Sequence, residues 1–137
     1  MPVKQVDYCT TIVKAGRAGE AAEALAALRK AGVNLLAFTG FPTSGGKAQL
    51  DFVAENLAGV RRVGRTQGWR LSAPKKAFLV QGSDAVGACH KQLRKLAKEG
   101  INVTAADAVT AGRGRWAMIL WVKQRDYARA ARALGAR

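Results

Sequence analysis

The chain has 137 residues, 49% of them hydrophobic, which is typical of one ordinary globular domain or two small ones and argues against a disordered chain. Its 23 Lys and Arg against 9 Asp and Glu give a net charge of +14, which would attract nucleic acid, anionic membrane or acidic ligands. The sequence has neither a targeting signal nor an apolar run of membrane-spanning length. We therefore expect a cytoplasmic protein with no membrane partner.

Two similar stretches, LRKAGVN at residues 28–34 and LAKEGIN at residues 96–102, indicate an internal duplication with an offset of 68 residues. Further positions repeat at the same offset: Gly19 and Gly87, Leu25 and Leu93, Leu50 and Met118, and Phe52 and Leu120. Apolar residues also recur at helical spacing in both copies: Ala18, Ala21, Leu25 and Leu28, then Val86, Cys89, Leu93 and Leu96. This spacing predicts one amphipathic helix in each half.

Around each helix the sequence predicts further elements in the same order. In the first half these are a strand over residues 6–12, the helix, strands over 33–40 and 48–53 joined by a glycine-rich turn, a helix over 55–66 and a short strand over 69–72. In the second half they are a strand over residues 77–80, the helix, strands over 101–108 and 116–122, and a helix over 124–134.

The order predicts an α+β fold of two ferredoxin-like βαββαβ repeats with antiparallel sheets. The repeats are expected at residues 1–73 and 74–137. The sequence ends at Arg137, so we expect the second repeat to lack its last strand. Such a repeat would leave an open strand edge.

Glycine-marked loops precede both first helices, and Gly-Val-Asn or Gly-Ile-Asn leads into both second strands. These features resemble the ACT domain, a small regulatory module that commonly binds amino acids, here in tandem over nearly the whole chain. The family's loop often reads Asp or Asn, any residue, Pro, Gly. The loops here, Gly16–Gly19 and Asp84–Gly87, both keep the glycine, only the second keeps the acid, and neither keeps the proline. The resemblance implies a ligand between such a loop and the second strand of a neighbouring module.

The chemistry of these loops suits an amino acid. A helix N-terminus offers unpaired N–H groups to a carboxylate, a glycine permits close approach, and Asp84 or Glu20 could receive the ammonium group. Alternatively Asp84 caps the helix, and Asn34 and Asn102 serve as turn or strand-start residues. The candidate ligand-binding residues are Arg17, Ala18, Gly19, Glu20, Asn34, Asp84, Ala85, Val86, Gly87 and Asn102.

Catalytic and metal-binding motifs are not apparent in the sequence. Cys9 and Cys89 lack metal-ligand spacing, and His90 has no Cys, Asp or Glu at ligand spacing nearby. The stretch GFPTSGGKA, residues 40–48, departs from a phosphate-binding loop because a strand follows where a helix is required. We therefore expect a non-catalytic protein without a metal or cofactor, which regulates a partner, such as an enzyme, by contact.

Two features bear on larger partners. Strands over residues 35–38 and 116–121 are apolar on both faces, which predicts a covered sheet face. We expect a homodimer formed through such a face or through the open strand edge. The alternative is a basic nucleic-acid-binding protein, because the RNA-recognition motif has the same element order, although Trp121 is the single aromatic residue on its expected binding strand face.

Overall fold

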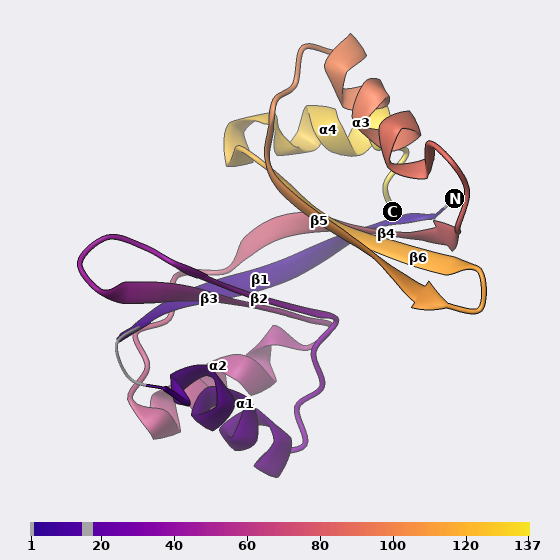
Figure 1. Cartoon of the computed structure of the whole chain (residues 1–137). Coiled ribbons are helices and arrows are strands. Elements are labelled where there is room, and N and C mark those ends of the chain that lie inside the picture. Colours follow the sequence, from indigo (N-terminus) through magenta and orange to yellow (C-terminus); the bar gives the residue numbers. More distant parts are fainter. Residues whose placement is uncertain (1, 15–17) are drawn as a thin grey trace. The chain divides into compact units, whose positions relative to one another are not determined.

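The computed structural model describes residues 2–14 and 18–137 and contains two compact units. One unit is Asp7–Lys75, and the other combines Met1–Val6 with Lys76–Arg137. In each unit two α-helices cover one face of an antiparallel sheet, which makes an α+β fold of the expected class (Figure 1). No helix in the described part of the chain is both long and apolar enough to cross a bilayer.

The Asp7–Lys75 unit orders its strands β2-β3-β1, with β1 at Val3–Lys14, β2 at Ala37–Pro42 and β3 at Lys47–Ala54. Its helices are α1 (Glu20–Lys30) and α2 (Leu57–Gln67). The core between helices and sheet contains Cys9, Ala24, Leu28, Leu50, Phe52, Ala54, Leu57, Val60 and Val63. In this core every second residue of β3 packs against the apolar side of each helix.

The Lys76–Arg137 unit orders its strands β4-β6-β5, with β4 at Lys75–Ser83, β5 at Val103–Gly112 and β6 at Arg115–Val122. Its helices are α3 (Ala88–Lys98), the short 3-10 helix η1 (Gln124–Asp126) and α4 (Tyr127–Leu134). The core contains Phe78, Val80, Leu96, Ile101, Trp116, Met118, Leu120, Val122, Tyr127, Ala130 and Leu134. Tyr127 stacks on Phe78 at 4.4 Å between ring centroids, and its hydroxyl donates to the Ala77 carbonyl at 2.8 Å.

The bounds of several elements repeat the offset seen in the sequence. Helix α3 begins and ends 68 residues after α1, and β6 begins and ends 68 residues after β3. The glycines before the two helices, Gly19 and Gly87, both have left-handed φ angles, 93° and 81°. Since glycine adopts this conformation without steric cost, the repeated glycine has a structural reason. The bounds of these elements agree with the predicted offset, and the layout of two full repeats stays a prediction.

The start of β1 lies in the unit of the sequence's second half. Val3 is only 3% exposed and belongs to the core of that unit. The Gln81 N–H donates to the Pro2 carbonyl, the Arg137 N–H to the Val3 carbonyl and the Gln5 N–H to the Arg137 carbonyl. No strand follows α4 in the described residues, but these N-terminal residues lie beside β4. The strand edge that we expected to be open is therefore occupied by the chain itself.

Residues 69–72, expected as a strand, form no regular strand. The Ser72 N–H donates to the Thr10 carbonyl at 2.9 Å, whereas the Thr10 N–H donates to the Ser72 hydroxyl at 3.0 Å. A side-chain oxygen thus replaces the carbonyl that a β-ladder would use, and the regular pairing stops there. The predicted second strand also begins later than expected, at Ala37.

The apolar strand faces of the second unit are already buried. Leu79, Ile119 and Trp121, which alternate with the core residues of β4 and β6, are each less than a tenth exposed in the single chain. The homodimer stays a prediction.

The two cysteines are expected to differ in reactivity. Cys9 is 0% exposed, and its burial raises the thiol pKa to about 11; nearby Asp51 also raises the pKa, and Arg61 lowers it. Only about one Cys9 in a thousand would be thiolate at pH 8, and the thiolate is the reactive form. Cys89 is half-buried. An aromatic disulfide reagent at pH 8 should modify Cys89 in the native protein and Cys9 only after unfolding. Rapid modification of native Cys89→Ser would contradict this assignment.

Candidate ligand-binding site

Helix α3 begins with free backbone donors. Its N-cap is Gly87, and no side chain caps the helix. The Ala88 N–H donates to the Ala85 carbonyl and the Lys91 N–H to the Gly87 carbonyl. The N–H groups of the two intervening residues, Cys89 and His90, have no acceptor among the described residues. The carboxylate of Asp84 is therefore not used as the helix cap, and the helix presents two N–H groups at its positive end.

A pocket of about 240 Å³ lies at this helix end. One side is the loop Asp84–Gly87 and the first turn of α3, and the other is strand β5. The lining residues are Asp84, Ala85, Gly87, Ala88, Cys89, His90, Ala108, Val109, Thr110 and Trp116. The Asp84 N–H donates to the Gly114 carbonyl at 2.7 Å, which fixes the loop to the β5–β6 hairpin. The pocket thus combines one carboxylate, one imidazole and the free donors of a helix.

Trp116 adds a buried donor to the pocket lining. It is 4% exposed, and its indole nitrogen Nε1 has no hydrogen-bond partner among the described residues. Buried donors are rarely left without an acceptor, because the lost hydration is not replaced. An acceptor bound in the pocket would be favoured if it reached this N–H group.

The corresponding loop of the first half has the same helix geometry. Gly19 is the N-cap of α1, no side chain caps the helix, and the Glu23 N–H donates to the Gly19 carbonyl at 2.8 Å. Ala18 and Gly19 are exposed and Glu20 is half-buried. The candidate residue Arg17 lies outside the described residues.

The two asparagines lie away from the loops of their own units. Asn34 and Asn102 are exposed and follow the C-terminal ends of α1 and α3, whereas the loops precede the N-terminal ends. Each helix has 11 residues and is therefore roughly 16 Å long. Asn34 lines a different pocket, together with Leu25, Leu28, Arg29, Gly32, Val33 and Leu35. Within one unit, therefore, the loop and the asparagine lie at opposite ends of the helix.

Other chemistry has less support in the described part of the chain. It contains no cluster of three or more His, Cys, Asp or Glu residues that could hold a metal ion. Trp121, the aromatic residue of the alternative nucleic-acid surface, is 7% exposed. Base stacking requires an accessible ring face, and the nucleic-acid alternative stays a prediction.

Part of the pocket could not be anticipated from the sequence. The Asp84–Gly87 loop was predicted as a site, and Val86 of that loop is fully exposed without lining the pocket. Residues 108–110 and Trp116 were not predicted. They reach the pocket through the pairing of β5 with β6, which places Thr110 opposite Trp116. This register depends on the bulge in the hairpin, which the sequence pattern does not reveal.

No family model and no curated protein matches the chain. Several solved structures share its fold. A protein from Bacteroides thetaiotaomicron superposes with a TM-score of 0.81 and 14% identity, over 97% of this chain and 88% of that one. The regulatory subunit of aspartate kinase from Thermus thermophilus superposes with a TM-score of 0.67 and 15% identity, over 98% of this chain and 95% of that one. A structure of aspartokinase alpha and beta subunits superposes with a TM-score of 0.63 and 14% identity, over 98% of this chain and 95% of that one. At these identities the similarity establishes the fold.

Proposed function

We propose that the chain is a non-catalytic regulatory protein that binds a small amino-acid-like metabolite. The observation that carries this proposal is the pocket at the start of α3, where Asp84 lies beside the free N–H groups of Cys89 and His90. A zwitterion has the complementary charges. Its carboxylate would accept from the helix end and its ammonium group would bind Asp84.

The size and setting of the pocket support the same ligand class. At about 240 Å³ it is smaller than the roughly 300 Å³ at which pockets for drug-sized molecules begin. The fold is shared with regulatory subunits of aspartate kinase, which supports a regulatory role and an enzyme as the regulated partner. Binding would shift the populations of two arrangements of the chain through different affinities for each.

Thermal unfolding with each of the twenty amino acids at millimolar concentration tests this proposal. A ligand specific to the native state at 100 times its Kd adds about 2.7 kcal/mol of apparent stability. We expect one or a few amino acids to raise the melting temperature, and Asp84→Asn to abolish this effect. Glu99→Gln is the control, because Glu99 lies at the other end of α3 and should leave the effect unchanged.

The same assay distinguishes the alternative function. No stabilisation by any amino acid, combined with binding of a short RNA or DNA that weakens steeply between two salt concentrations, would refute the metabolite proposal. The net charge of +14 would then be the functional feature.

A further inference from the structure

A second pocket, of about 550 Å³, lies within the Asp7–Lys75 unit. The end of β1 and the start of β3 form part of its wall, and the segment after α2 forms the rest. The lining residues are Thr11, Ile12, Val13, Lys14, Lys47, Gly68, Trp69 and Arg70. Its volume is within the range of small-molecule sites. The pocket lies in the other unit from the Asp84 site and is independent of the proposed function.

The pocket is positively charged. Lys14, Lys47 and Arg70 line it, and none of the lining residues is acidic. Among residues 2–14 and 18–137 no carboxylate forms an ion pair with any of the three cations. Moreover Lys14 lies directly opposite Lys47 in the β1–β3 register. Like charges in directly opposed positions destabilise a sheet, and a bound anion would remove this cost.

The pocket also has a fixed aromatic wall. Trp69 stacks on the buried ring of Phe52, with 5.4 Å between centroids and 7° between planes. Its backbone N–H donates to the Gly64 carbonyl at 2.8 Å, and the preceding Gly68 turns the chain with a φ of 75°. Trp69 is nevertheless only half-buried. Because its position is set before a ligand arrives, little ordering entropy would be lost on binding.

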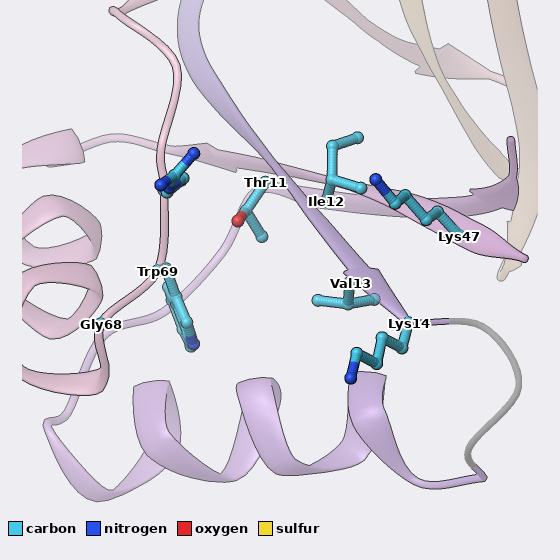
Figure 2. Close-up of a pocket in the computed structure, with 8 residues that line it drawn as sticks. Thr11, Ile12, Val13, Lys14, Lys47, Gly68 and Trp69 are labelled. Carbon is cyan, nitrogen blue, oxygen red and sulfur yellow. The ribbon is translucent and has the colours of Figure 1, made fainter. Parts of the chain in front are cut away.

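These two features lie on different sides of the same space. Figure 2 shows Trp69 on one side of the pocket, Val13 and Lys14 of β1 facing it, and Lys47 beside Ile12 across β1. Thr11 brings a hydroxyl group into the lining. A ligand that uses both sides must carry a flat ring and, at some distance from it, an anionic group.

We propose that this pocket binds a small anion with a flat aromatic or heterocyclic body. The ring packs against Trp69, and a carboxylate or phosphate group binds Lys14, Lys47 and Arg70. A single partly exposed indole in a pocket of this volume favours a small molecule over a nucleic-acid strand, which needs successive stacking platforms.

Calorimetry with four probes separates the two parts of this ligand. Adenosine 5′-monophosphate and indole-3-acetate carry a ring with phosphate or carboxylate, inorganic phosphate carries no ring, and adenosine carries no anion. At least one of the two ring-bearing anions should bind about tenfold more tightly than both inorganic phosphate and adenosine, because binding then uses both sides of the pocket. Saturable binding of neither ring-bearing anion at millimolar concentration would overturn the proposal.

Two charge-reversal variants locate the binding. Lys47→Glu should weaken binding about tenfold or more, since it removes an attraction and adds a repulsion in the pocket. The fold should persist, because glutamate would then lie opposite Lys14 as a favourable cross-strand pair. Lys123→Glu changes the net charge equally at an exposed position outside the pocket and should have less than about a twofold effect. Equal weakening by both variants would refute the site.

The role of Trp69 is tested by Trp69→Phe, which keeps a ring against Phe52. Binding of the ring-bearing anions should weaken several-fold, while binding of inorganic phosphate should not change. A short single-stranded RNA that binds more tightly than adenosine 5′-monophosphate, and loses this advantage in Trp69→Phe, would overturn the small-molecule assignment in favour of a strand.

Discussion

Replacing Val3 by Asp should lower the free energy of unfolding by about 3 to 5 kcal/mol, although Val3 stands almost at the start of the sequence. Its side chain is buried in the core of the unit formed mainly by residues 76–137. The substitution removes apolar burial and places a carboxylate among apolar side chains that cannot solvate it. Guanidinium-induced unfolding followed by circular dichroism measures the loss.

Gln5→Asp is the matched control for this variant. Gln5 lies on the same strand, is exposed, and its replacement changes the net charge by the same amount. Its effect should stay within about 0.5 kcal/mol, as for most exposed substitutions. If both variants were equally stable, Val3 would not belong to the core, and the assignment of the N-terminal residues to that unit would be wrong.

The second large effect is expected at Asp51, a carboxylate that is 5% exposed in the middle of β3. It accepts from the Thr10 hydroxyl at 2.7 Å, the Thr39 hydroxyl at 3.0 Å and the Gln49 side-chain amide at 3.0 Å. Thr10 and Thr39 lie directly opposite Asp51 on the two neighbouring strands. Asp51→Ala leaves these donors without their acceptor and should cost about 2 to 4 kcal/mol, measured by urea unfolding.

Two comparisons separate this network from general packing. Asp51→Asn has nearly the same shape and keeps one acceptor oxygen, so its loss of stability should be intermediate. Burial raises the pKa of Tyr8, and the charge of Asp51 raises it further. Both variants should therefore lower the pH at which Tyr8 ionises, measured by tyrosinate absorbance with Tyr127→Phe as background. An Asp51→Ala protein as stable as the wild type would refute the network.

Much of the fold follows from local pattern. The apolar spacing and terminal glycines predicted α1 and α3, and the 68-residue offset predicted that β6 would repeat β3. These features depend on residues close in sequence, where helical and strand periodicity are directly visible. The same holds for the Asp84–Gly87 loop, because the residue pattern that opens a helix is local.

The remainder depends on contacts between distant residues. Asp51 lies between Leu50 and Phe52, a position that strand alternation places on the face away from the core. The structure nevertheless buries it among donors from other strands. The second pocket brings Lys14, Lys47 and Trp69 together from three segments. The periodicity within one segment cannot predict that these three residues line one pocket, because their positions depend on the strand register and on the turn after α2.

The position of residues 2–6 also has a consequence for the order of folding. The Asp7–Lys75 unit is continuous in sequence and closes only loops within itself. The pairing of Gln81 with Pro2 closes a loop that contains that entire unit. Loop closure over such a separation costs more entropy and slows folding. During translation the N-terminal segment must therefore wait, unpaired, until β4 has been synthesised, and a strand that waits exposed is a site for pairing with other chains.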